Sequence, residues 1–395
     1  MIGNYSKLVY RFGFILLFSL PSMALIQKFF SLMGILIYML IVTLVVRLLL
    51  KFRAKIFSFV SKFYLTILAF IIIFGIACFA FVYPLETSGV LGRGSDRDEA
   101  LNIAFWEFVQ GRYPYFAVTH LGGKITPLPG SILLASPFIL LGNSAYQNLF
   151  WLAIFLLLTS VYLKSHISAI LMLMFLAVLS PAFQYEYISG GDLIANSIYI
   201  LTAIFLQTKA LSSNSFIAKF STSIFTGITL ASRSNFLTLL PLLFVLFWRS
   251  SGKRVALTYL SLSVLTLISI VMPFYLVLPN EFPPFFAGNK LSEINTSIPF
   301  ASTGIILLTL LASVLLSLHL FKVSKSHLLP SCILYCAIVQ AFPMVCGILL
   351  MSILKSQLDF SLLLHRYGLM FLFFDLWGLW PLLLVNSSSK STLSL

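Results

Sequence analysis

The chain has 395 residues, of which 60% are hydrophobic and only 9% are charged, with a mean hydropathy of +1.04. A water-soluble domain carries roughly 25% charged residues, so this composition excludes a soluble enzyme, a disordered protein and a nucleic-acid binder. The net charge of +14 is typical of a membrane protein with basic cytoplasmic loops. All four cysteines fall in apolar runs, and we expect them to pack in the interior without a disulfide or zinc.

Long apolar runs predict an all-α, polytopic transmembrane bundle that forms a single integral-membrane domain over residues 1–395. A spanning helix needs about 20 mostly apolar residues. The exact number of spans stays open, because several runs are short. The first run has a second interpretation as a signal peptide, but the short turn that follows it favours retention. The twelve expected spans are 9–26, 29–50, 63–83, 147–163, 167–182, 192–207, 216–231, 235–248, 255–278, 300–321, 328–351 and 361–385.

The charges give these spans an orientation. With the N-terminus inside, 16 of the 25 lysines and arginines face the cytoplasm, and ten of the 11 acids lie at the outer side. This arrangement follows the positive-inside rule and predicts a multi-pass protein of a bacterial inner membrane, with its active site facing the periplasm. Asp375 lies within a span, where we expect it to make an interhelical hydrogen bond.

Two long outer loops, 84–146 and 279–299, concentrate the remaining polar residues. The first loop is expected to hold two amphipathic helices at the membrane surface. Ser95 is expected to cap the first of them, and acids occupy its first turn. The second follows Pro127-Leu128-Pro129 and is too short to span the membrane easily. The chain has no nucleotide-binding glycine loop, which argues against an ATP-driven process on the inside.

Ordered motifs in the first outer loop carry a family resemblance. They are Asp98-Glu99, Gly111-Arg112-Tyr113-Pro114, Pro127-Leu128-Pro129 and Leu140-Leu141-Gly142. This order resembles the first-loop pattern of the C-type glycosyltransferase superfamily, which includes protein O-mannosyltransferases and lipid A aminoarabinose transferases. The chain departs from the pattern where Leu128 separates two prolines that are usually adjacent, and it has two additional N-terminal spans.

The resemblance implies an inverting transfer of a sugar from a polyprenyl-phosphate carrier to an acceptor on the outer face. Asp98 would be the general base, and Glu99 would orient the site or bind the acceptor. Arginines suit the donor phosphate because they make bidentate contacts. The implied donor-phosphate residues are Arg233, Arg366 and His365, and the implied substrate-binding residues are Asp192, Asp96 and Tyr113.

Each of these residues also has a structural interpretation. Asp192 would suit a helix N-cap, Arg233 a side chain that snorkels to the interface, and Arg366 a contact with lipid headgroups. Asp98 and Asp192 could together hold a divalent metal, but we expect no obligate metal and no cofactor. The expected partners are membrane lipid, the polyprenyl-phosphate sugar and an unidentified acceptor, with no nucleic acid.

Two other functions remain open. A transporter or flippase for a lipid-linked or small polar substrate usually carries polar residues near the midplane of the membrane, whereas here only Asp375 lies deep. An outer-face polysaccharide polymerase or ligase would have its largest outer loop late in the chain, whereas here the largest loop comes first.

Overall fold

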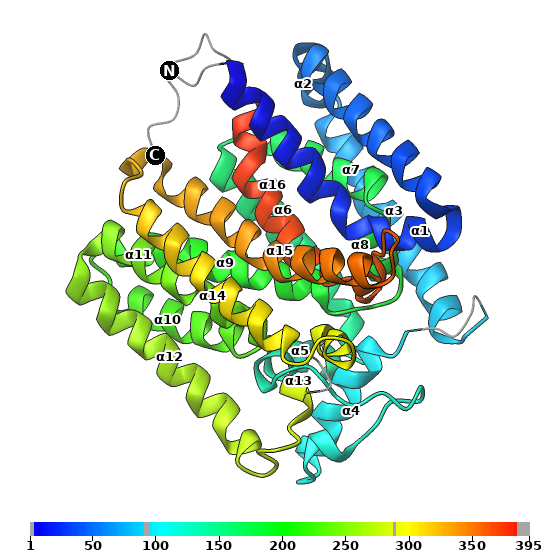
Figure 1. Ribbon diagram of the computed structural model, residues 1–395. Coiled ribbons are helices and arrows are strands. Elements are labelled where there is room, and N and C mark those ends of the chain that lie inside the picture. The colour runs from blue at the N-terminus through cyan, green and yellow to red at the C-terminus, as the bar shows by residue number, and fades with distance from the viewer. Residues whose placement is uncertain (1–3, 91–94, 287–289, 385–395) are drawn as a thin grey trace.

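The computed structural model describes residues 4–90, 95–286 and 290–384, and within these ranges the chain is helical apart from turns and one isolated bridge between Val118 and Lys124 (Figure 1). The side chain of His365 and part of the 279–299 loop lie outside the described residues. The α-helices are α1 (Asn4–Lys51), α2 (Arg53–Lys62), α3 (Tyr64–Thr87), α4 (Arg97–Val109), α5 (Pro129–Leu140), α6 (Gln147–Leu163), α7 (His166–Leu179), α8 (Pro181–Ile188), α9 (Leu193–Leu211), α10 (Phe216–Leu230), α11 (Leu240–Ser251), α12 (Lys253–Tyr275), α13 (Pro283–Phe286), α14 (Ala301–Leu320), α15 (Leu328–Leu354) and α16 (Leu369–Leu384). The 3-10 helices are η1 (Pro114–Phe116), η2 (Ser144–Tyr146), η3 (Ser234–Leu239), η4 (Lys290–Thr296), η5 (Lys325–His327) and η6 (Ser361–His365).

Eight helices in the described ranges are long and apolar enough to cross a membrane, or nine if the bent pair α7 and α8 forms one span. Their outer surfaces are apolar: in α3, Leu65 is 75% exposed and Phe81 is 74% exposed. A continuous apolar surface of this kind requires lipid around it, because water would solvate it poorly. The chain is therefore a helical membrane protein.

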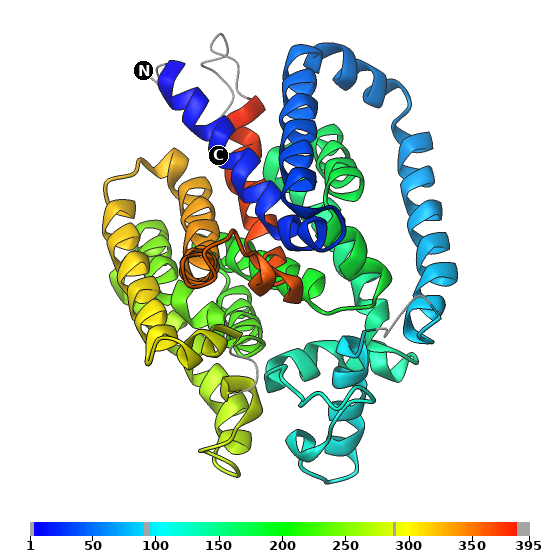
Figure 2. The same ribbon diagram turned by 45° about the vertical axis from the view of Figure 1, so that its right-hand side comes forward.

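Two expected spans belong to one bent helix, and another expected span is interrupted. The runs 9–26 and 29–50 both belong to α1, which breaks at Ser31 with φ 59°, and Figure 2 shows the chain reversing direction within this helix. The run 167–182 is divided into α7 and α8, which meet at an angle of 87°. Pro181 cannot continue the hydrogen bonding of α7, and the Ser180 hydroxyl instead accepts the Phe183 N–H at the start of α8.

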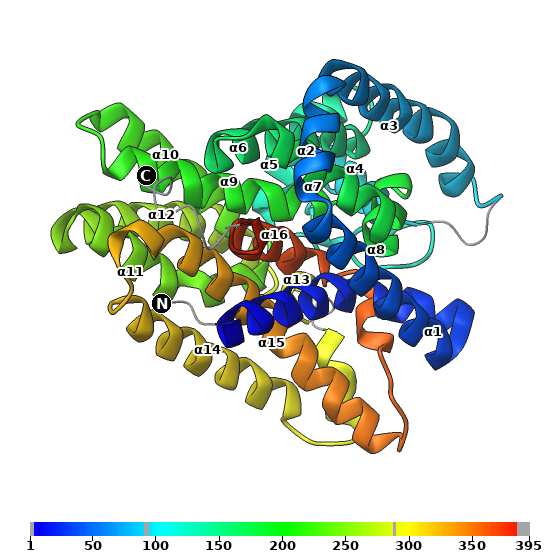
Figure 3. The same cartoon turned by 90° about the horizontal axis from the view of Figure 1, so that it is seen from above.

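The most deeply buried helices are α9 and α16. Figure 3 shows α16 in the interior of the bundle, where it packs against α1, α9 and α15. Phe371, Phe374, Trp377 and Trp380 of α16 are all fully buried. The indole N–H of Trp377 donates to Thr159 Oγ1 of α6 at 2.8 Å, which gives the large apolar ring a satisfied polar atom. The core is thus built on aromatic packing around α16.

Asp375 does not make the expected interhelical hydrogen bond with any described residue. Its side chain is fully buried in α16, and neither carboxyl oxygen has a hydrogen-bond partner among the described residues. The neighbouring positions Phe374 and Leu376 are also fully buried and apolar. The sequence indicates a deep acid here but does not indicate that its surroundings would lack a donor.

The helices of the first loop lie at the end of the bundle opposite the start of α1 and the end of α16 (Figure 1). Leu101 and Ala104 of α4 pack with Ile132 and Ala135 of α5 in a small separate core. The expectation of an amphipathic second helix is wrong, because α5 is apolar on both sides: one side packs against α10 and α12, and the other exposes residues such as Leu140.

The cap expected for α4 also differs. Asp96, rather than Ser95, occupies the N-cap position, and its side chain makes no capping hydrogen bond. The Ser95 hydroxyl instead accepts a hydrogen bond from Arg366 Nη2 at 3.3 Å. A contact with a residue 271 positions away replaces the local cap.

Gly130 fixes the approach of α5 to the end of α10. A Cβ at this position would lie 2.3 Å from the Ile228 carbonyl oxygen and 2.6 Å from that of Ala231. We expect Gly130→Ala to destabilise the protein by about 1–3 kcal/mol, because backbone cannot move away as a flexible side chain would. The measurement is the thermal unfolding midpoint of the purified protein in detergent. Gly304→Ala is the matched control, because its Cβ would meet nothing within 4 Å; equal midpoints for the two variants would contradict the close approach.

Candidate functional site

Buried ion pairs gather at the end of the bundle that carries α4 and α5, which we call the charged end. One of these pairs joins Arg233, between α10 and η3, to Asp192, directly before α9. Arg233 is 8% exposed and Asp192 is 2% exposed. Asn196 Nδ2 also donates to Asp192 Oδ2, at 2.9 Å. Asp192 therefore holds an arginine and does not cap its helix.

The first loop holds the turn that carries Arg233. The Leu128 N–H donates to the Ser232 carbonyl at 3.2 Å, and the Gly130 N–H donates to the Ala231 carbonyl at 2.9 Å. The start of α5 thus completes the hydrogen bonding of a turn about a hundred residues later in the chain. Arg233 is consequently buried between chain segments, and it is not a snorkelling surface residue.

A second buried network surrounds Glu186 at the end of α8. Its carboxylate lies 3.0 Å from Arg366 Nε and 3.8 Å from Arg97 Nη1. Arg366 Nη1 also donates to Ser189 Oγ at 2.5 Å, and the guanidinium stacks over the Tyr185 ring at 4.5 Å. Arg366 is therefore enclosed by protein groups and does not serve as a lipid headgroup contact.

Gly191 permits this arrangement. The chain turns after α8, and the Gly191 N–H donates back to the Glu186 carbonyl at 3.1 Å. A Cβ on Gly191 would lie 2.3 Å from Glu186 Oε1. A side chain at this position would displace the carboxylate from the arginines and from the Leu193 N–H, which donates to it at 2.8 Å.

Asp98 lies in the first turn of α4 and is 5% exposed. One carboxyl oxygen accepts the Tyr83 hydroxyl, which itself accepts Asn143 Nδ2 at 2.7 Å. The other oxygen, Oδ1, is buried and has no hydrogen-bond partner among the described residues. Burial raises the pKa of Asp98 above its ordinary value of 3.8, and the Tyr83 hydrogen bond opposes this rise only in part.

The other acids of the first loop make local contacts. Glu99 binds the backbone N–H and the ring Nδ1 of His120, and Asp96 accepts the Thr119 hydroxyl at 2.6 Å. These contacts fold the 111–128 segment back onto the start of α4. Tyr113 donates to the Phe274 carbonyl at 2.7 Å, which ties the same segment to α12.

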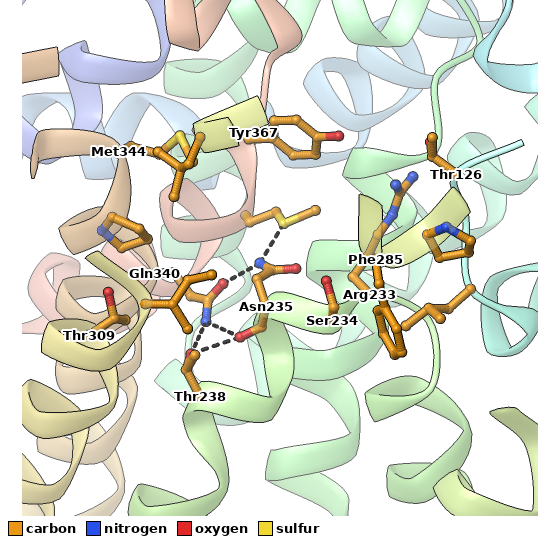
Figure 4. Close-up of a pocket in the computed structure, with 16 residues that line it drawn as sticks. Thr126, Arg233, Ser234, Asn235, Thr238, Phe285, Thr309, Gln340, Met344 and Tyr367 are labelled. Carbon is orange, nitrogen blue, oxygen red and sulfur yellow. Dashed lines mark hydrogen bonds between the residues drawn. The ribbon is translucent and has the colours of Figure 1, made fainter. Parts of the chain in front are cut away.

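A cavity of about 290 Å³ opens beside Arg233 (Figure 4). Arg233 is the only charged side chain among the described residues of its lining, and the other lining residues are apolar or carry neutral polar groups. Among the sequence-predicted site residues, Arg233 is the one that lines it. The lining residues are Thr126, Leu128, Arg233, Ser234, Asn235, Thr238, Pro284, Phe285, Leu291, Ile306, Thr309, Gln340, Pro343, Met344, Tyr367 and Met370.

Arg97 connects the two buried networks to the cavity. Its guanidinium approaches Glu186 and lies 5.8 Å from the ring of Tyr367, which lines the cavity. Asp98, the next residue, points instead toward Tyr83 and Asn143. The structure thus brings Arg233, Arg366 and Asp98 to one end of the bundle, with Arg97 and Asp98 directed to different sides of α4.

The two carboxylates considered as metal ligands are held by other groups, since Asp192 pairs with Arg233 and Asp98 accepts from Tyr83. In the part of the chain that the structure describes, no group of three His, Cys, Asp or Glu side chains is placed to hold a metal ion.

Several contacting residues could not be selected from the sequence. Glu186 lies between two expected spans and Arg97 lies in the first turn of an expected helix, and their charges alone gave a weak signal. Tyr83, Asn235 and Gln340 lie within or next to apolar runs, where a single polar residue is usually a packing residue. Only their proximity in space distinguishes them.

Because the Arg233–Asp192 pair is buried, removing one partner should have a large effect on the stability of the protein. Asp192→Asn leaves the buried guanidinium without its counter-charge, and we expect it to lower the free energy of unfolding by about 3–5 kcal/mol. The measurement is the thermal unfolding midpoint in detergent. Glu107→Gln breaks the exposed pair between Glu107 and Arg112 and should change the midpoint little. A similar midpoint for both variants would show that the buried pair is not needed.

In comparisons with known proteins, no family model, no curated protein and no solved structure matches the chain.

Proposed function

We propose that the chain is a membrane glycosyltransferase that moves a sugar from a polyprenyl-phosphate carrier to an acceptor, in a bundle of about twelve membrane segments with the charged end on the periplasmic side of a bacterial inner membrane. The observation that carries the proposal is the cavity at the charged end, where one buried guanidinium stands among apolar walls. A lipid-linked phosphate has the matching chemistry, since it joins one anionic group to a long apolar chain.

Arg233 is the residue proposed to bind the donor phosphate. Its Nε–H is buried and has no acceptor among the described residues, and Asp192 holds the guanidinium in a fixed orientation. A preorganised cation stabilises the charge that develops on the phosphate as the glycosidic bond breaks. Apolar wall residues such as Phe285 and Ile306 would contact the first units of the lipid.

Asp98 is the proposed general base. An oxygen or nitrogen of the acceptor attacks the anomeric carbon, the bond from that carbon to the phosphate oxygen breaks, and the acceptor proton passes to the Asp98 carboxylate. The unpaired Oδ1 supplies a proton-accepting position, and the raised pKa brings the group closer to the range in which a base works well. A single displacement of this kind inverts the anomeric centre. His365, whose side chain lies outside the described residues, keeps its place in the proposal only as a neighbour of Arg366 in sequence.

One observation favours a second candidate, a transporter or flippase. Asp375 is a fully buried acid in α16 without a partner among the described residues, and acids at such depth are often functional. A transporter would lose function in Asp375→Asn and keep it in Asp98→Asn. The glycosyltransferase would show the reverse. Transport and sugar transfer, both measured in liposomes reconstituted with each variant, therefore separate the two functions.

The base assignment predicts that Asp98→Asn lowers transfer by roughly 10²–10⁴-fold, because an amide cannot accept the proton. The Asn carbonyl can still accept the Tyr83 hydroxyl, so the fold should persist. The measurement is the transfer of label from a radioactive polyprenyl-phosphate hexose to acceptors in membranes that contain the chain. Glu107→Gln, which changes an acid on the same helix, is the control. Retention of full transfer by Asp98→Asn would exclude this residue as the base.

The hydrogen bond from Tyr83 to Asp98 predicts that replacing Tyr83 shifts the pH dependence of the transfer rate. Transfer requires the Asp98 carboxylate, so its rate should rise with pH through a pKa above 3.8. The Tyr83 hydrogen bond lowers this pKa. Tyr83→Phe should therefore move the acid limb of the pH–rate profile to higher pH. Tyr64→Phe, at the opposite end of α3, should leave the limb in place. An unchanged limb in Tyr83→Phe would contradict the coupling.

A further inference from the structure

Three polar side chains form a connected cluster in the cavity wall beside Arg233. Asn235 and Thr238 belong to η3, and Gln340 belongs to α15. Gln340 Nε2 donates to the Asn235 backbone carbonyl and to Thr238 Oγ1, both at 3.1 Å, and Asn235 Nδ2 donates to Gln340 Oε1. Figure 4 shows the three together, with Ser234 between them and Arg233.

The cluster holds the Asn235 side chain in an orientation that leaves its Oδ1 without a hydrogen-bond donor among the described residues. Its side-chain N–H groups are directed toward Gln340 Oε1 and toward Met370 Sδ, at 2.8 Å from the sulfur, which is a weak acceptor. Its Oδ1 accepts no hydrogen bond from the described residues, and in Figure 4 it points away from Gln340, toward the side of Ser234. Because the amide is held by two partners, this oxygen is a fixed acceptor for a hydroxyl group of a ligand.

The charge of the lining restricts which ligand fits. Among the described lining residues there is no carboxylate, and Arg233 carries the only charge. The remaining polar groups are neutral amides and hydroxyls, including Ser234, Thr126 and Thr309. A cationic group on a ligand would meet no counter-charge here and would lie close to the Arg233 guanidinium. A neutral group with several hydroxyls would meet donors and acceptors.

We propose that Asn235, Gln340 and Thr238 form the sugar subsite of the cavity, and that this subsite selects a prenyl phosphate carrying an uncharged sugar over one carrying an amino sugar. This proposal rests on the proposed function for the identity of the ligand as a lipid-linked sugar. The cavity, at about 290 Å³, is at the lower limit of roughly 300–1,000 Å³ found for small-molecule pockets, and so accommodates a headgroup and not the whole lipid.

The test is equilibrium binding to the full chain in detergent, with three probes: farnesyl phosphate, farnesyl-phosphate mannose and farnesyl-phosphate aminoarabinose. We expect the mannose compound to bind most tightly. Asn235→Leu should weaken its binding by roughly 3- to 10-fold, the loss expected for one hydrogen bond, and should leave farnesyl phosphate unchanged. Gln357→Leu, an exposed position outside the lining, is the matched control.

A second variant keeps the test decisive if Asn235→Leu fails to fold. Asn235→Asp preserves the size of the side chain and adds the missing carboxylate, so it should shift the preference toward the aminoarabinose compound. Equal binding of the mannose and aminoarabinose compounds by the wild type, or an unchanged preference in Asn235→Asp, would overturn the subsite.

The outcome also separates the subsite from the proposed function. Binding that depends on Asn235, with no sugar transfer by the wild-type chain, would support the subsite and overturn the glycosyltransferase. Transfer that depends on Asp98, with a sugar preference that ignores Asn235, would support the enzyme and overturn the subsite.

Discussion

The buried ion pair between Arg233 and Asp192 is the interaction on which the arrangement of the charged end depends. Each charge alone would be costly inside an apolar bundle, and the pair is stable only because both side chains are held close together. The pair joins the start of α9 to the turn before η3. The backbone of that same turn binds Leu128 and Gly130, so the first loop, α5 and one wall of the cavity are all positioned from it.

Two arginines that look equivalent in the sequence have different environments. Arg366 is surrounded by Glu186, Ser189, Ser95 and the Tyr185 ring, and it donates hydrogen bonds to both serine hydroxyls. Arg233 has one acidic partner and lines a cavity. A ligand phosphate would have to displace several protein groups to reach Arg366. Under the proposed function, this difference favours Arg233 over Arg366 for the phosphate, while Arg366 connects the first loop to α8.

The sequence predicted the fold class and the clustering of charges, and both have a simple physical origin. Apolar runs must be helical in lipid, and charges must leave it, so hydropathy and charge alone place Asp192 and Arg233 at the same end of the bundle. The break at Ser180 was missed, because hydropathy reports burial and not the direction of the helix axis. The pairing of Glu186 with Arg366 was missed because 180 residues separate them, and the isolation of Asp375 was missed because a sequence does not show an absent neighbour.

At the charged end, consecutive residues of α4 point to different sides of this helix, which bears on how transfer would proceed. Consecutive residues on a helix point about 100° apart, since a turn takes 3.6 residues. Arg97 therefore faces Glu186 and the cavity residue Tyr367, whereas Asp98 faces Tyr83 on the side of α3. Inversion requires the nucleophile and the leaving group to lie on opposite faces of the reacting carbon. Under the proposed function, a carrier phosphate at Arg233 and an acceptor that gives its proton to Asp98 would therefore have to reach opposite faces of the same carbon.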